Sequence, residues 1–332
     1  MSAFVGLDVH SDHTFATVIN EDGKIVCKKR IMNDQVLSFL KPFNVEKVGF
    51  EASTSIAPLY RALSKEGYRV QVSHPKKTRY IAEARIKCDR VDSKAIAELV
   101  RLDALPLSYV PPEEIAKLRE KVRRRAFLVR ERSKLMAKVK SVLAYEGIRP
   151  PKEHGTFTKM GIAWLRSLNL EPIDCYLRVM DPLSEEIGKL SLELKHMAEG
   201  DEDVKLLMTI PGIGYYTALL VKAEVGDVRR FSTGEQLCSY AGIVPSTHAS
   251  GNITRHGGIT REGSRWLRWA MVEAALTHLK YDTSITRAYH RIAERRGKQI
   301  AQVAAARKLL MCCWSVLKNK QPYHDQAFET PR

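Results

Sequence analysis

The feature that most constrains this chain is a short apolar segment, Ala3–Val9, that carries an acidic residue, Asp8, near its end. The sequence Ala-Phe-Val-Gly-Leu-Asp-Val predicts a short buried strand. An ionised carboxylate is costly to remove from water, so Asp8 must either be solvated at a sheet edge or face a cation. The end of this strand is therefore the first candidate for a functional site.

Three more acidic residues in the first hundred positions extend this pattern. Glu51 closes a second apolar segment, Lys47–Glu51. Asp89 and Asp92 stand three positions apart, which places both on one face of a helix start. Four carboxylates on three separate elements, able to converge at one end of a sheet, are what two divalent metal ions need for phosphoryl transfer. Asp8, Glu51, Asp89 and Asp92 are therefore the candidate metal ligands.

The order of the surrounding elements indicates a mixed α/β domain. Strands are expected over 3–9, 13–20 and 24–31, and Asp22-Gly23 is a hairpin turn signal. The elements expected next are a helix over 34–41, a strand over 47–51, a helix over 59–66, a strand over 68–72, and helices over 76–85 and 91–102. This order, with acids at the strand ends, is typical of an RNase H-like domain. An actin-like ATPase would share the opening hairpin, but the chain shows neither a glycine-rich phosphate loop nor a second copy of the unit.

A proline-punctuated segment over 105–112 marks the end of this domain. One long helix is expected over 113–146, because apolar residues recur at heptad spacing in a stripe typical of a coiled-coil arm. These residues are Ile115, Val122, Val129, Met136 and Leu143. A shorter apolar repeat over 183–197 can pack back on this arm or on another subunit. We therefore expect an RNase H-like domain over 1–108, a helical coiled-coil arm over 109–200 and a mainly α-helical domain over 201–332.

Charge is the strongest signal in the overall composition. The net charge is +16 and the isoelectric point is about 9.6, and chains this basic usually bind a polyanion, most often nucleic acid. Residues 113–140 hold eleven Lys and Arg against four Glu, with Arg123, Arg124 and Arg125 at the centre. Residues 251–310 hold twelve Lys and Arg against four acids. These regions are candidate nucleic-acid contacts, and the alternative for the helix is a charged face that is only solvated.

Composition also indicates a compartment. No apolar run approaches the roughly eighteen residues of a membrane span, and the chain starts directly with a strand, without a basic and apolar leader. The six cysteines have no zinc-ligand spacing and are expected to be reduced thiols without disulfides. We therefore expect a soluble cytoplasmic protein that does not act at a membrane.

The segment Ile210–Gly214, with the sequence Ile-Pro-Gly-Ile-Gly, predicts the hairpin of a helix-hairpin-helix. Gly212 and Gly214 would allow close backbone approach, so that amide groups at the start of the next helix face a phosphate. The alternative interpretation is a purely structural turn between two helices.

A polar loop over 246–258 is rich in hydroxyl groups and glycine. Four arginines lie in or near it, namely Arg255, Arg261, Arg265 and Arg268. Ser250 precedes Gly251 in this loop and is a candidate nucleophile on a DNA phosphate, because glycine exposes the hydroxyl and arginines stabilise charge on phosphoryl oxygens. The competing interpretation is that Ser250 is a turn residue, the commoner role of a serine before glycine.

Taken together, these motifs resemble the DEDD transposases. The residues that carry the resemblance are Gly6–Asp8, Phe50–Ser53, Lys87–Asp92, Ile210–Gly214, Tyr240–Pro245, Ser250–Gly251 and Gly258–Gly263. The resemblance spans nearly the whole chain in the order of that family, which comprises bridge-RNA-guided recombinases of insertion sequences, with Piv-type DNA invertases as relatives. An acidic tetrad and a C-terminal serine rarely occur together in one chain, so the resemblance is highly specific.

The resemblance implies a RuvC-like N-terminal domain in which Asp8, Glu51, Asp89 and Asp92 form an Asp/Glu/Asp/Asp tetrad that binds Mg²⁺. It also implies a C-terminal transposase domain in which Ser250 attacks a DNA phosphate and forms a covalent phosphoserine link. Relatives often have Lys where Arg261 stands and Asn where Ser264 stands, and both changes keep charge or polarity. The nearest rival hydroxyls are those of Ser246, Thr247 and Ser264.

The resemblance implies partners as well. These are double-stranded donor and target DNA, a structured noncoding guide RNA, and further copies of the chain that form dimers and then tetramers on two DNAs. Two other enzymes remain open, a metal-dependent nuclease of the Holliday-junction type and a protein-only site-specific invertase. A non-catalytic nucleic-acid-binding protein is less consistent with the sequence, because four converging acids without a metal would repel one another.

Overall fold

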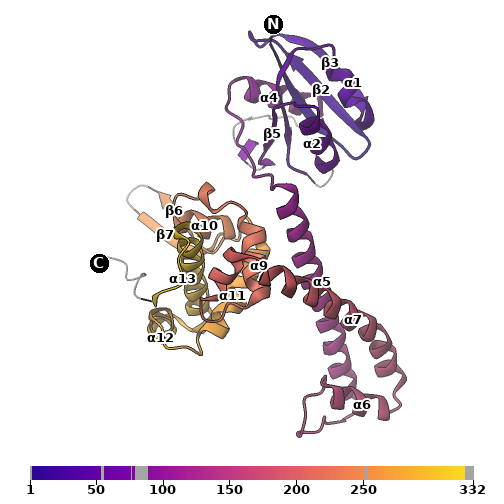
Figure 1. Cartoon of the computed structure of the whole chain (residues 1–332), viewed down its shortest axis with the longest axis vertical. Helices are drawn as coiled ribbons and strands as arrows, with labels where there is room; N and C mark the ends of the chain where they lie inside the picture. Colours follow the sequence, from indigo (N-terminus) through magenta and orange to yellow (C-terminus); the bar gives the residue numbers. More distant parts are fainter. Residues whose placement is uncertain (1, 54–55, 76, 79–88, 251–252, 326–332) are drawn as a thin grey trace. The chain divides into compact units, whose positions relative to one another are not determined.

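The computed structural model describes residues 2–53, 56–75, 77–78, 89–250 and 253–325, without the side chains of 89–92, 247–250 and 253–256 (Figure 1). The chain divides into two compact units, Met1–Val110 and Pro111–Arg332, which we describe separately. The first is mixed α/β and the second is mostly helical. The finer division of the chain into three domains remains a prediction.

The first unit is built on a five-stranded mixed sheet with the strand order β3-β2-β1-β4-β5. The strands are β1 (Ala3–Val9), β2 (His13–Ile19), β3 (Ile25–Met32), β4 (Val45–Glu51) and β5 (Val70–Ser73). β1 is antiparallel to β2 and parallel to β4, and β5 continues in parallel beyond β4. The predicted strands are confirmed to within about two residues at either end.

Helices cover both faces of this sheet. They are η1 (Asn33–Gln35), α1 (Val36–Leu40), α2 (Ile56–Lys65) and α4 (Asp89–Arg101). Because side chains alternate along a strand, Val5 and Leu7 pack with Leu40 and Leu63 from α1 and α2 on one face. Phe4 packs against α4 on the other face. The helix predicted over 76–85 lies mostly outside the described residues.

Helix α4 lies in direct contact with the sheet because two strand positions have no side chain. A Cβ atom on Gly6 would lie 2.1 Å from the Ser93 carbonyl oxygen and 2.3 Å from the Ala97 nitrogen. A Cβ atom on Gly49 would lie 2.2 Å from a methyl carbon of Val100. The Thr17 and Ser93 hydroxyls hydrogen-bond at 2.9 Å in the same layer. Glycine in β1 and β4 therefore fixes how close α4 comes to the sheet.

The second unit begins with the predicted long helix, α5 (Glu113–Tyr145), which is confirmed to within one residue. Helix α7 (Glu171–Glu199) packs back along it, and α6 (Lys159–Ser167) closes the far end (Figure 1). Val122 and Leu143 of the heptad stripe are buried. Helix α7 starts twelve residues earlier than its apolar repeat predicts, because Pro182 lies inside the helix and not at its start.

The rest of this unit packs around one apolar core. Its elements are α8 (Glu202–Met208), α9 (Tyr215–Val225), η2 (Val228–Arg230), α10 (Gly234–Ala241), β6 (Pro245–Ser250), β7 (Ile253–Ile259), α11 (Arg265–His278), α12 (Ser284–Arg296) and α13 (Lys298–Asn319). Cys238, Cys312 and Cys313 are free thiols in this core. Burial raises the pKa of Cys238 and of Cys312 to about 12, which keeps both groups protonated near neutral pH.

Helix α13 is the one described helix that bears on the expectation from apolar runs. By length and average composition it is apolar enough to cross a membrane, although basic side chains interrupt every long apolar run. Half of the most apolar stretch of this helix is buried inside the protein, where Leu309, Leu310 and Val316 belong to the core. Its hydropathy is therefore accounted for by packing against the neighbouring helices.

We predict that Gly6→Ala destabilises the first unit by about 1–3 kcal/mol, because the added carbon meets backbone atoms of α4 that cannot rotate away. Gly188→Ala in α7 is the control, since no atom lies within 4 Å of its Cβ position, and it should stabilise the second unit by about 0.5–1 kcal/mol. Hydrogen exchange in urea reports each unit separately. An unchanged opening free energy for β1 and α4 would contradict the close contact.

Candidate functional site

The two acids at the strand ends project from the same face of the sheet. Gly6 pairs with Gly49 across the parallel β1 and β4 strands, and Leu7 pairs with Phe50. Because strand side chains alternate, Asp8 and Glu51 lie on the face of the two glycines, which is the face that α4 covers. Both residues are half-buried. The fold thus brings two of the four predicted ligands to adjacent positions.

The start of α4 lies toward the same edge of the sheet. Ser93 and Ala97 lie against Gly6, whereas Arg101, at the end of α4, donates to the Glu21 carbonyl in the β2–β3 turn, beside the start of β1. The helix therefore runs opposite to β1, and its first turn lies near the end of that strand. Asp89 and Asp92 belong to this first turn, and their side chains lie outside the described part of the structure.

A pair of stacked histidines lies beside Asp8, and the sequence patterns did not single them out. The His10 Nε2 atom lies 3.4 Å from the Asp8 carboxylate. The His10 ring stacks on the ring of His13 with a centroid separation of 4.7 Å, and His13 contacts the Asp12 carboxylate at 2.7 Å. The hydrogen bond from His13 lowers the pKa of Asp12. The available signal was His10, directly after the strand that carries Asp8, with His13 at the start of the next strand.

The donor chemistry at this edge suits a hard divalent cation. Asp8 and Glu51 offer carboxylate oxygens from one sheet face, and Mg²⁺ prefers oxygen ligands of this kind. Among the side chains that the structure describes, three or more His, Cys, Asp or Glu groups do not gather closely enough to hold a metal ion. A complete set of ligands at this edge would need Asp89 and Asp92 in addition.

The predicted serine lies on a β-hairpin of the second unit. Ser250 ends β6 and pairs with Ile253 of β7, while Arg255 in β7 pairs with His248. The side chains of these residues and of Thr247 lie outside the described part, as does the residue after Ser250. Two rival hydroxyls have structural partners. The Ser246 Oγ donates to the Gly258 carbonyl at 2.9 Å, and Ser264 caps α11 by accepting from the Leu267 nitrogen at 3.1 Å.

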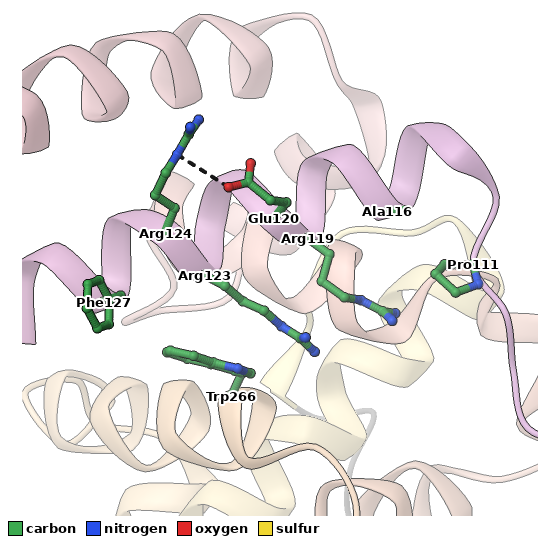
Figure 2. Close-up of a pocket in the computed structure, with 8 residues that line it drawn as sticks. All are labelled: Pro111, Ala116, Arg119, Glu120, Arg123, Arg124, Phe127 and Trp266. Carbon is green, nitrogen blue, oxygen red and sulfur yellow. Dashed lines mark ion pairs between the residues drawn. The ribbon is translucent and has the colours of Figure 1, made fainter. Parts of the chain in front are cut away.

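The three consecutive arginines of α5 point in different directions. Arg123 donates to the buried Glu224 carboxylate at 2.7 and 2.9 Å. The Arg125 guanidinium lies 4.3 Å from the Tyr216 ring centre and donates to the Ser191 hydroxyl. Arg124 is exposed on the far side of the helix and pairs with Glu120, as Figure 2 shows. Within this triplet, Arg124 is the residue placed to meet a partner in solvent.

The arginines after the hairpin divide in the same way. Arg268 is half-buried and donates to the Ala241 carbonyl at 2.8 Å, and burial lowers its pKa. Arg265 is exposed beside the Trp266 ring, 5.3 Å from its centre. Arg261 is exposed with a left-handed backbone, at φ 55°. Arg261 and Arg265 are therefore the accessible members of this group among the described side chains.

The predicted hairpin connects α8 and α9. Gly212 has a φ of 85°, and a Cβ atom there would lie 2.7 Å from the His278 nitrogen at the end of α11. The close approach at Gly212 is therefore to the protein's own backbone. Gly214 is exposed at the start of α9, with no atom within 4 Å of its Cβ position.

A buried ion pair joins three helices of the second unit. The Glu224 side chain is fully buried, and its carboxylate accepts from Arg123 on α5 and from the Ser264 hydroxyl at 2.8 Å before α11. Arg119, one turn before Arg123, lies 4.0 Å from the same carboxylate. Sequence reasoning missed this cluster, although an acid inside the apolar sequence of α9 was a signal. A buried carboxylate requires such partners.

Comparison with known sequences places both units in one class of protein. Residues 5–146 match a family model described as transposase, and residues 204–291 match one described as Transposase IS116/IS110/IS902 family. The first range contains the four predicted acids, and the second contains Gly212, Gly214 and Ser250. The class is therefore that of the transposases, which are enzymes that cut and rejoin DNA.

Relatives of known description agree along most of the chain. The transposase for insertion sequence element IS1111A of Coxiella burnetii is 29% identical over 330 residues, covering 96% of this chain and 90% of the relative. The transposase for insertion sequence element IS1328 of Yersinia enterocolitica is 26% identical, with coverages of 94% and 96%. The pilin gene-inverting protein of Moraxella bovis is 31% identical over 140 residues, or 41% of this chain and 42% of that protein. The chain belongs to the IS110/IS116 family of insertion-sequence transposases.

We predict that Glu224→Gln destabilises the second unit by about 2–3 kcal/mol, because an uncharged amide cannot satisfy Arg123 and Ser264 together. Glu120→Gln is the matched control at an exposed position. Its i,i+4 pair with Arg124 is solvated, so the loss should stay below about 0.5 kcal/mol. Urea unfolding followed by circular dichroism measures both variants. Equal effects from the two substitutions would contradict a structural role for the buried carboxylate.

Proposed function

We propose that this transposase cuts and rejoins DNA with two separate groups of residues. The first is the tetrad Asp8, Glu51, Asp89 and Asp92 in a RuvC-like first unit, and the second is Ser250 in a C-terminal transposase domain. One observation carries the proposal. The β1–β4 register and the contact of Gly6 with α4 bring the backbones of all four acids toward one edge of the sheet.

The acids hold the cation and orient the phosphate in this proposal. Asp8 and Glu51 supply carboxylate oxygens from the sheet, and Asp89 and Asp92 supply them from the first turn of α4. These four residues would hold Mg²⁺, and the ion would supply positive charge against the phosphoryl oxygens. His10 lies next to Asp8 and restricts where its carboxylate can move.

Ser250 carries the covalent step. Its Oγ atom forms a bond to the phosphorus of a DNA phosphodiester while the bond from phosphorus to one deoxyribose oxygen breaks. The serine proton passes to a nearby base, and the departing oxygen takes up a proton and leaves as a hydroxyl. The exchange conserves the energy of the phosphodiester bond for rejoining. Arg255 and Arg261 lie close in sequence and can stabilise the phosphoryl oxygens.

The serine and the tetrad belong to different units, so we propose that the complete site forms on assembly with DNA and between subunits. Dimers that pair into tetramers on donor and target DNA would provide that assembly. We also propose that the RuvC-like domain spans 1–108 and that the coiled-coil arm spans 109–200. The transposase domain, with its helix-hairpin-helix, then spans 201–332.

We predict that Ser250→Ala abolishes a covalent protein–DNA adduct and leaves duplex binding within about twofold, because the substitution removes the nucleophile without changing charge. Denaturing gel electrophoresis of labelled donor DNA measures the adduct. Ser246→Ala is the control and should keep the adduct, since the Ser246 hydroxyl bonds the Gly258 carbonyl. Asp8→Asn should also remove the adduct.

The same gel discriminates the competing nuclease. A metal-dependent enzyme of the Holliday-junction type would cut DNA with the tetrad and water, so Ser250→Ala would still yield free nicked ends. Free nicked ends in Ser250→Ala, with no covalent adduct in the unsubstituted protein, would show that Ser250 is not the nucleophile.

We further propose that a structured noncoding RNA guides the choice of donor and target. Support comes from the net charge of +16 and from the surplus of basic residues along α5.

We predict that one RNA species is strongly enriched when the protein is purified from cells carrying its native locus. Sequencing of the co-purified RNA measures this. An absence of enrichment would favour protein-only inversion, to which the similarity with the pilin gene-inverting protein points.

A further inference from the structure

Two cavities lie between α5 and α11 in the second unit, and Trp266 lines both of them. Their volumes are about 440 and 370 Å³. Figure 2 shows Arg123 and Phe127 reaching from α5 toward the Trp266 ring in the first cavity. Trp269, three residues further along α11, lines the second cavity. We call this surface the α5–α11 groove.

Aromatic rings are unusually accessible along this groove. Phe127 is 48% exposed and Trp269 is 41% exposed. The Trp266 and Trp269 rings meet edge to face, with their centres 6.5 Å apart. Large rings are normally buried in a soluble protein, and a group of exposed ones is typical of a binding surface.

Arginine side chains surround these rings. The Arg130 guanidinium lies 6.0 Å from the centre of Phe127 and 5.9 Å from that of Trp266, and Arg265 lies 5.3 Å from Trp266. Five arginines line the two cavities, at positions 119, 123, 124, 130 and 265, against the carboxylates of Glu120 and the buried Glu224. Five positive and two negative charges leave a surplus of three.

This combination favours one kind of occupant. Flat rings bind the faces of nucleobases by stacking, and arginines bind the phosphates between them. A duplex conceals its base faces within the stack, whereas an unpaired strand presents them. A protein partner would have to be strongly acidic to match the surplus positive charge of the groove. Any nucleic-acid strand matches it, because every strand carries negative phosphates.

We propose that the α5–α11 groove binds unpaired nucleotides of a single nucleic-acid strand. Bases stack on Phe127, Trp266 and Trp269, and the connecting phosphates contact Arg130 and Arg265, the two arginines beside these rings. The groove shares no residue with the acid tetrad and does not include Ser250, so its role goes beyond strand cleavage. The unpaired nucleotides can come from an RNA loop or from a displaced DNA strand, which share the same stacking chemistry.

The full-length protein is titrated against fluorescein-labelled, unstructured oligonucleotides, with RNA and DNA versions of one sequence and the corresponding DNA duplex. Trp269→Ala should weaken single-strand binding about tenfold, as expected for the loss of one stacked base, and should leave the salt dependence unchanged. Arg130→Gln should instead lower the slope of log K against log salt by about 0.7. A loss of affinity for the RNA strand, the DNA strand or both supports the site and shows whether it binds ribose or deoxyribose strands.

Phe127→Ala is the second variant, because this exposed ring contributes little to the core. Quenching of tryptophan fluorescence by the unlabelled strand provides an independent measure of stacking. Tyr145→Ala is the control, since this ring is 89% exposed at the opposite end of α5. These measurements need no DNA cleavage, so their outcome is independent of whether Ser250 forms an adduct.

Three results would overturn the site. The first is single-strand affinity that stays unchanged in both Trp269→Ala and Phe127→Ala. The second is an equal loss in Tyr145→Ala or an equal loss of duplex binding, either of which would indicate a non-specific effect. The third is a change of oligomeric state in sedimentation with unchanged oligonucleotide affinity, which would make the groove an interface between two copies of the chain.

Discussion

The contact between Gly6 and helix α4 determines what the first unit can present to solvent. A side chain at this position would collide with Ser93 and Ala97, so any larger residue would lift the helix from the sheet. The strand register and the direction of α4 then decide which ends lie together. Asp8, Glu51 and the first turn of α4 share one edge because of backbone packing, without any attraction between the acids. Like charges held together in this way repel one another unless a cation offsets them.

A buried carboxylate has the corresponding role in the second unit. Glu224 joins α5, α9 and the start of α11, so it ties the long helix to the body that carries the serine hairpin. The same contact sets one side of the α5–α11 groove, because Arg123 lines the groove and is held by Glu224. A stable framework and an open binding surface come from neighbouring residues on α5.

The sequence predicted those elements whose periodicity is local. The strands around Asp8 and the boundaries of α5 followed from alternation and from heptad spacing. Contacts that join distant segments were not accessible in this way. The pairing of Arg123 with Glu224 connects positions 101 residues apart, and no local pattern encodes it. The close contact of Gly212 with the end of α11 likewise joins distant segments, and its motif indicates only a turn that allows close backbone approach.

The arginines of this chain show why charge alone is a coarse guide to nucleic-acid contacts. Arg123, Arg125 and Arg268 hold a carboxylate, an aromatic ring and a backbone carbonyl, respectively. Part of the basic surplus therefore has structural partners. Arg130 and Arg265 keep their charge at an accessible surface beside the rings around Trp266. Charge draws any nucleic acid to the surface, but a ring can be used only by a strand with free base faces. The coincidence of the two features therefore distinguishes the groove from the rest of a basic protein.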